Sequence, residues 1–236
     1  MSGRPRRISP IREGNSTRDE ILDASAELFT TDGFAATTTR RIAESVGIQQ
    51  ASLYYHFKTK DDILDALLAM TIDQPLHYAA LIADRPEAPV VRLYALALGD
   101  AAQLAASRWN LGALYLLPDL RAERFSAFRG KRDQLRTHYQ ELAAAACRAS
   151  MLRAGVERLP FRLVESVIML RADGDSIAPE ALADATLRVV GVTGDAGEIE
   201  GAARVLLGQL DWPVAIPKRW AQHVVLGCRP VQGSRC

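Results

Sequence analysis

The chain has 236 residues, a formal net charge of +1, 48% hydrophobic residues and 24% charged residues. This composition is typical of a globular protein and excludes a disordered chain, while the small net charge does not by itself indicate a nucleic-acid binder. No apolar run approaches the roughly 20 residues of a membrane-spanning helix, and no apolar segment of a signal peptide follows the arginine-rich start. Three cysteines without paired or metal-ligand spacing predict neither a disulfide framework nor a metal site. We therefore expect a cytoplasmic protein with no membrane association, no metal and no cofactor.

Residues 1–15 contain proline, glycine, serine and arginine without an apolar period, and four of the chain's bases lie in the first twelve residues. This pattern predicts a flexible basic arm. It has two interpretations, a leader without a role or an arm that reaches phosphates or the minor groove of DNA.

A first helix is predicted from Thr17 to Asp32, because Ile21, Leu22, Leu28 and Phe29 form one apolar stripe at helical spacing. Ser16 or Thr17 can cap its start, and Asp19 and Glu20 lie in the first turn, where the helix dipole favours acidic side chains. Gly33 is expected to end it. This helix is expected to build a core, and no chemistry is assigned to it.

The next stretch predicts two short helices joined by a tight turn, from the N-cap Thr38 to Val46 and from Gln49 to His56, with Gly47 in the turn. A fourth helix is expected to start near Lys60. The second short helix begins with small and polar residues and ends with aromatic ones. Such a helix covers a core poorly, but it suits a groove about 12 Å wide.

The residues from 16 to 72 resemble the TetR family of bacterial transcriptional regulators. The resemblance rests on Thr38-Thr39-Arg40-Arg41-Ile42-Ala43, Val46-Gly47-Ile48, Leu53-Tyr54-Tyr55-His56-Phe57, Lys60 and Ile63-Leu64. It implies an all-α fold in which a three-helix DNA-binding domain precedes a helical effector-binding and dimerisation domain. The expected organisation is an arm at 1–15, a helix-turn-helix domain at 16–60, an effector-binding and dimerisation domain at 61–212, and a tail at 213–236.

The resemblance places DNA contacts at Thr39, Arg40, Gln50, Ser52, Tyr54, Tyr55, His56 and Lys60. Their chemistry agrees, because arginine can donate two bonds to guanine and glutamine can pair with adenine. Hydroxyl groups, those of Thr38 and Thr39 included, and the lysine ammonium suit phosphate oxygens. Gln49 and Gln50 stand where many family members carry serine and lysine, which favours base reading over phosphate attraction.

Each of these positions also has a structural interpretation. Thr38 can serve as a cap alone, His56 can bond to the backbone, and Lys60 can be a solvated lysine at a helix start. One of the two tyrosines is expected to pack with its ring, and Tyr55 is expected to be the more exposed. For Arg40 and Gln50 the alternative is an ordinary solvated surface.

From Gln74 onward every clear period is helical, and no alternation predicts a sheet. Helices are expected in the ranges 90–106, 109–117, 121–153, 161–170, 179–190, 198–210 and 217–226, with 109–117 buried on almost every side. The resemblance implies a small effector between the central helices and a homodimer formed by the last helices. Apolar residues that suit such an interface, or extra core, are Leu163, Val164, Val167, Ile168, Val205, Leu206 and Leu210.

The effector is expected to be mostly apolar, because few charges occur among its candidate contacts. Those contacts are Met70, His77, Trp109, Tyr115, Leu116, Phe128 and Tyr139. Core packing is the alternative for each.

Other classes of function have weaker support. Gly191 to Gly197 carries glycines at every third residue, but it lacks the order and the strand–helix frame of a nucleotide loop. Cys147 has no base beside it, so no catalytic site is predicted. The best interpretation is a dimeric repressor that binds a palindromic double-stranded operator and is released by an effector. The alternatives are a DNA-binding or interaction protein that needs no effector, and an enzyme.

Overall fold

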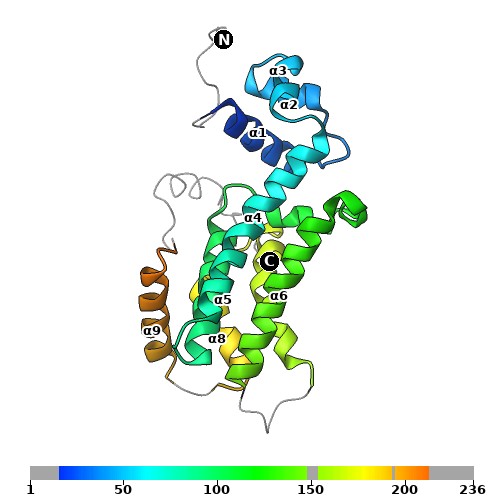
Figure 1. Cartoon of the computed structure of the whole chain (residues 1–236). Coiled ribbons are helices and arrows are strands. Elements are labelled where there is room, and N and C mark those ends of the chain that lie inside the picture. The colour runs from blue at the N-terminus through cyan, green and yellow to red at the C-terminus, as the bar shows by residue number, and fades with distance from the viewer. Residues whose placement is uncertain (1–15, 148–153, 193–194, 213–236) are drawn as a thin grey trace, which may run out of the picture.

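The computed structural model describes residues 16–147, 154–192 and 195–212, and every regular element in these ranges is helical. Three helices, α1 (Thr17–Thr31), α2 (Thr39–Val46) and α3 (Gln50–His56), form a small unit at one end of the molecule, here termed the head (Figure 1). Helix α4 (Lys60–Ala83) runs from the head into the larger helical unit, termed the body. The expected all-α fold is confirmed.

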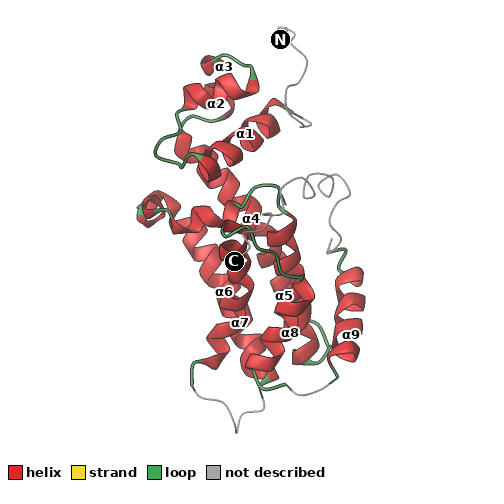
Figure 2. Ribbon diagram, turned by 180° about the vertical axis from the view of Figure 1, so that it is seen from behind, coloured by secondary structure: helices red, strands yellow, loops and turns green. Residues whose placement is uncertain are grey.

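The body consists of α5 (Pro89–Ala106), α6 (Ser126–Ala146), α7 (Leu159–Ala172), α8 (Pro179–Val189) and α9 (Ala196–Gln209). Figure 2 shows these helices side by side along the long direction of the molecule. Helix α5 is central, since it contacts α4, α6, α7, α8 and α9. Its residues from Leu93 to Ala102 are all buried. This burial explains why the sequence of this stretch is apolar on almost every side of the helix.

The described part of the body also contains four short 3₁₀ helices: η1 (Leu111–Leu116), η2 (Pro118–Arg121), η3 (Glu123–Phe125) and η4 (Val156–Arg158). Two predictions for this region are wrong. The range 109–117 is a 3₁₀ turn with one exposed side, and the helix expected from Arg121 begins only at Ser126. Arg129 explains the late start, because its guanidinium donates to the carbonyl oxygens of Leu120 and Ala122 and so satisfies two turn carbonyls outside the helix.

The remaining boundaries agree with the sequence to within two residues. Gly33 has a φ of +90° just after α1, as its expected role as a helix-ending glycine requires. Gly191 follows α8 with a φ of +76°, and Asp195 caps α9, so the glycine-rich stretch joins two helices. The exception is the helix predicted to reach residue 153, which instead ends at Ala146, where Cys147 takes an extended conformation as its C-cap, so that prediction is also wrong. The helix predicted at 217–226, the basic arm and the tail lie outside the described residues.

The head and the body are joined by more than the chain connection. Helix α4 begins with a capping box, in which Thr59 and Asp62 each accept the backbone N–H of the other. Arg124 of η3 pairs with Asp61 and Asp62 in the same turn, at 2.9 and 3.1 Å. From the other side, the Trp109 indole nitrogen donates a 2.9 Å bond to Asp23 of α1. None of the helices in the described ranges is long and apolar enough to cross a membrane.

Candidate nucleic-acid interface

The turn between α2 and α3 has the geometry that its sequence predicts. The Thr38 hydroxyl accepts the Arg41 backbone N–H at 3.2 Å, which caps α2. Gly47 ends α2 with a φ of +72°, a left-handed conformation that is cheap for glycine. Ile42, Val46 and Leu53 are fully buried, so the two helices are held at a fixed angle and their outer faces are free for another role.

The exposed side chains of Gln50 and Tyr54 in α3 meet that of the half-buried Thr39 at the start of α2. The Gln50 amide nitrogen lies 2.9 Å from the Thr39 hydroxyl and 3.4 Å from the Tyr54 hydroxyl, and the two hydroxyls are 3.0 Å apart. We term this arrangement the Thr39–Gln50–Tyr54 cluster. It orients the Gln50 side chain before any partner arrives, which lowers the entropy cost of binding through that amide.

The other predicted contacts surround this cluster. Arg40 has a 78% exposed side chain and pairs with Glu44 one turn later at 2.8 Å. Solvent screens such an exposed pair, so it does not hold the guanidinium back from a stronger acceptor. Tyr55 is 82% exposed and Tyr54 is 40% exposed, which confirms the expected order. His56 packs edge-on against the Tyr55 ring, while Gln49 and Ser52 are exposed at the start of α3.

Lys60 is placed differently from the expectation of an ammonium free for phosphate. Its nitrogen donates to the carbonyl oxygens of Phe34 and Thr37, at 2.7 and 2.9 Å, and lies over the Phe34 ring. Lys58 instead projects from the end of α3, is exposed, and bonds only the Tyr54 carbonyl at 3.4 Å. Lys58 is not among the DNA contacts expected from the sequence. The signal for it is the neighbouring Phe57, whose burial turns the next residue outward.

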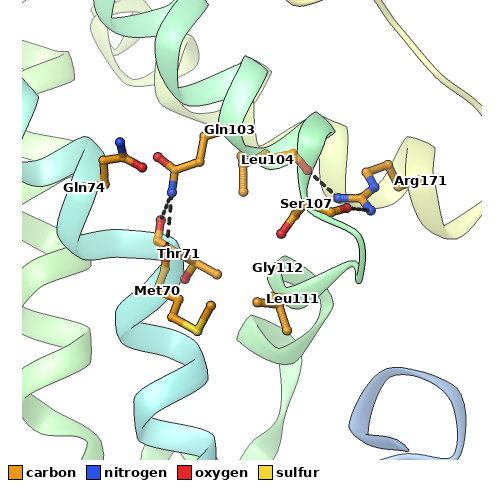
Figure 3. A pocket seen from close by; sticks show the side chains of 9 residues that line it. All are labelled: Met70, Thr71, Gln74, Gln103, Leu104, Ser107, Leu111, Gly112 and Arg171. Atoms are coloured by element: carbon orange, nitrogen blue, oxygen red, sulfur yellow. Dashed lines mark hydrogen bonds between the residues drawn. The ribbon is translucent and has the colours of Figure 1, made fainter. Parts of the chain in front are cut away.

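A pocket of about 130 Å³ lies in the body (Figure 3). Residues of α4, of the end of α5, of η1 and of α7 surround it: Met70, Thr71, Gln74, Gln103, Leu104, Ser107, Leu111, Gly112 and Arg171. Five of these nine carry polar side chains. The lining is therefore more polar than the sequence analysis expected for an effector site.

Of the seven predicted effector contacts, only Met70 lines this pocket. Leu116 is 71% exposed and His77 is also exposed, while Trp109 bonds to Asp23. Three further aromatic side chains lie in or against the core. Tyr115 donates a 2.7 Å bond to Thr71 and packs against Phe128, and Tyr139 bonds to the buried Asp100 at 3.0 Å. For Phe128 and Tyr139 the structure therefore supports the core-packing interpretation.

Comparison with known proteins agrees with the helix-turn-helix geometry of the head. The family model for bacterial regulatory proteins of the tetR family matches residues 21–67. The crystal structure of Mycobacterium smegmatis AmtR is 51% identical, covers 85% of this chain and 98% of that chain, and superposes with a TM-score of 0.81. The chain belongs to the TetR family.

Two further TetR-family comparisons are informative. The transcriptional repressor KstR2 of Mycobacterium tuberculosis H37Rv is 39% identical over 82 residues, which are 35% of this chain and 41% of that protein. The chain thus matches less than half the length of this curated relative. The solved structure of M. tuberculosis KstR2 is 24% identical with a TM-score of 0.62 over 78% of this chain and 98% of that chain, which supports the fold alone.

For a TetR-family head, the DNA-contacting roles of the individual residues stay predictions. The structure brings Thr39, Gln50 and Tyr54 together and leaves Tyr55 and Arg40 accessible beside them. It separates Lys60 from this group, because carbonyl oxygens and an aromatic face already hold its charge.

Proposed function

We propose that this protein is a homodimeric, cytoplasmic transcriptional repressor that binds a palindromic operator through the head and is released by a small-molecule effector. The observation that carries the proposal is the exposed Thr39–Gln50–Tyr54 cluster. Its polar atoms serve no core, yet they are held in one arrangement by hydrogen bonds between two helices. An interface for a hydrogen-bonding partner accounts for that arrangement better than a solvated surface does.

In this proposal α3 enters the major groove and α2 crosses the backbone. Gln49, Gln50 and Arg40 read base edges, with Gln50 suited to adenine and Arg40 to guanine. The hydroxyl groups of Thr38, Thr39, Ser52, Tyr54 and Tyr55, together with His56 and Lys58, face phosphate oxygens. Lys60 is proposed to shape the head rather than to contact phosphate.

A palindromic operator needs a two-fold protein, since each half-site takes its own α3 about 34–36 Å from the other. We propose that the outer faces of α8 and α9 form the dimer interface. Val205 of α9 is apolar and 61% exposed, so it is available to a second copy of the chain. Val164, Val167, Ile168 and Leu206 are buried within the chain itself, so they belong to its own core.

Effector control is supported by a solved structure with the same fold. This is the structure of AibR in complex with isovaleryl coenzyme A and operator DNA, which is 17% identical with a TM-score of 0.56. In the present chain, α4 begins in the head and lines the pocket in the body with Met70, Thr71 and Gln74. A ligand that shifts α4 would change the separation of the two heads, and a coupling of about 1–3 kcal/mol is enough for a switch.

The test is selection of bound fragments from a random double-stranded DNA pool by the full chain. We expect enrichment of a palindrome with half-sites one helical turn apart, bound by a dimer in analytical ultracentrifugation. Arg158→Ala is a matched control for the head variants, because this arginine is 74% exposed and paired with Glu157 but lies in η4 of the body. Enrichment of no common sequence would overturn the proposal.

A further inference from the structure

The pocket in the body lies where α4 lacks one of its backbone hydrogen bonds. Pro75 is within this helix and has no N–H, so the carbonyl oxygen of Thr71 has no partner one turn further on. The side chain of Gln103 takes that place. Its nitrogen donates to the carbonyl oxygens of Thr71 and Met70, at 3.4 and 3.3 Å (Figure 3).

These two bonds fix the Gln103 amide so that its oxygen points elsewhere. Figure 3 shows the oxygen on the side that faces Gln74. This Oε1 atom is buried and has no hydrogen-bond partner among the described residues. A buried acceptor without a donor is costly, so the site favours any molecule that brings one.

We infer that this pocket is the effector site and takes a small, uncharged polar ligand that donates a hydrogen bond to Gln103 Oε1. The inference rests on the proposed function and specifies the effector. A volume of about 130 Å³ is below the roughly 300–1,000 Å³ of pockets for drug-sized ligands, so the site excludes large apolar molecules. The mostly apolar effector expected from the sequence does not fit this lining.

The charges around the pocket select a neutral ligand. Arg171 is the one charged residue of the lining, and its guanidinium donates to the carbonyl oxygens of Leu104 and Ser107 at the end of α5. Its positive charge disfavours a cation, and no carboxylate of the lining offsets it. An anionic group such as a carboxylate has no proton to donate, so it would leave the Gln103 oxygen unpaired and repel it. A neutral hydrogen-bond donor, such as an amide, meets both requirements.

The wall of the pocket opposite α4 is formed by the segment from Ser107 to Gly112, which also bonds to the head. Ser107, Leu111 and Gly112 line the pocket, and the intervening residues Arg108 and Trp109 hold Asp23 of α1, at 3.3 and 2.9 Å. The other side of this wall is packed tightly against α7, so the wall cannot move in that direction. Asn110 donates to the Ile168 carbonyl of α7 at 2.9 Å, and a side chain on Gly112 would come within 2.5 Å of Ile168.

Occupation of the pocket therefore acts on the head by two routes. One is α4 itself at its proline, and the other is the bond from Trp109 to Asp23. A ligand that separates α4 from the wall strains that bond, since α7 holds the wall on the other side. The Trp109 indole N–H thus reports the state of the pocket.

The experiment uses the full chain labelled with ¹⁵N-tryptophan, in which the Trp109 signal is the one of three indole signals that is lost in Trp109→Phe. Acetamide is the probe, and acetone is the matched control because it has the same shape and an acceptor oxygen but no N–H. We expect acetamide to shift the Trp109 signal saturably in the native protein and acetone to leave it unchanged. Equal shifts with both, or a shift that rises linearly without saturation, would overturn the inference.

Two variants sharpen the result. Gln103→Leu removes the acceptor and should abolish the acetamide shift, with circular dichroism confirming that the helices are retained. Ser107→Leu fills the pocket and should abolish the shift without touching Gln103. Persistence of the shift in either folded variant would contradict the site.

The last measurement separates this inference from the proposed function. On a selected operator, saturating acetamide should lower the affinity of the native protein about fivefold or more, and that of Trp109→Phe clearly less. A protein that binds its operator but shows no acetamide-dependent shift defeats the inference alone. A protein that shows the shift but selects no operator defeats the proposed function alone.

Discussion

The ammonium nitrogen of Lys60 lies 4.2 Å from the centre of the Phe34 ring and donates a 2.7 Å bond to the carbonyl oxygen of the same residue. This contact joins the first residue of α4 to the loop that precedes α2. We predict that Lys60→Met lowers the free energy of unfolding by about 1–3 kcal/mol, because it removes a charge-assisted bond and a cation–π contact. Chemical denaturation measures this loss.

Lys58→Met is the control, because it is expected to change DNA binding and leave stability unchanged. Its ammonium is exposed and weakly bonded, so stability should not change. The slope of log binding constant against log salt should instead decrease by about one unit, as expected for one lost phosphate contact. A stable Lys60→Met protein with a reduced salt slope would reverse the two assignments.

Base reading is predicted to depend on Gln50 and Arg40. Each alanine substitution should cost about 1–3 kcal/mol of operator binding and relax the preference at one base pair. Thr39→Val should have a smaller effect, because it leaves the Gln50 amide in place but removes the hydroxyl that orients it. Binding to a set of single-base operator variants measures the preference. An unchanged preference in Gln50→Ala would place α3 outside the groove.

Asp100 makes stability depend on pH. Burial raises the pKa of this carboxyl to about 7, although the bond from Tyr139 lowers it. Between the unfolded pKa near 4 and this value, the native state holds a proton that the unfolded state has lost, so stability falls as pH rises through this window. Asp100→Asn should remove the dependence and raise the free energy of unfolding at pH 8 by up to about 4 kcal/mol relative to the native protein. Urea denaturation at pH 5 and pH 8 measures the fall in stability of the native protein with pH and the absence of that fall in Asp100→Asn.

Packing at the end of the described chain yields a fourth prediction. A side chain on Gly99 would lie 2.8 Å from ring carbons of Trp212, which itself stacks on Tyr78 at 4.4 Å. Gly99→Ala should therefore cost about 1–3 kcal/mol of stability. Gly130→Ala, in α6 with no atom near the added carbon, should gain up to about 1 kcal/mol. Thermal unfolding of the pair separates the clash from the general effect of alanine in a helix.

Much of the head could be predicted from the sequence because its signals are local. Thr38 caps the helix that directly follows it, and Gly47 needs a positive φ in a turn between adjacent helices. Burial of Leu53 and exposure of Tyr55 follow from helical spacing within a few residues.

The body could be predicted only as a set of helices, since its decisive contacts join distant residues. Trp109 bonds to an acid 86 residues away, and Tyr139 bonds to one 39 residues away. The pocket depends on a proline in α4 that meets a glutamine in α5. Aromatic content led to Phe128 and Tyr139 as ligand contacts, but aromatic side chains fill cores as readily as they line sites.

The continuity of α4 limits how this regulator can be recombined with others. Ile63 and Leu64, after the first turn of α4, are fully buried, and α4 contacts α1, so a graft cut at residue 60 would remove side chains that the transplanted unit buries. The transferable unit therefore extends several turns into α4. A recipient would also need an indole donor opposite Asp23 and a guanidinium opposite Asp61 and Asp62. Exchange of sensors among such proteins thus requires matched junctions as well as matched operators.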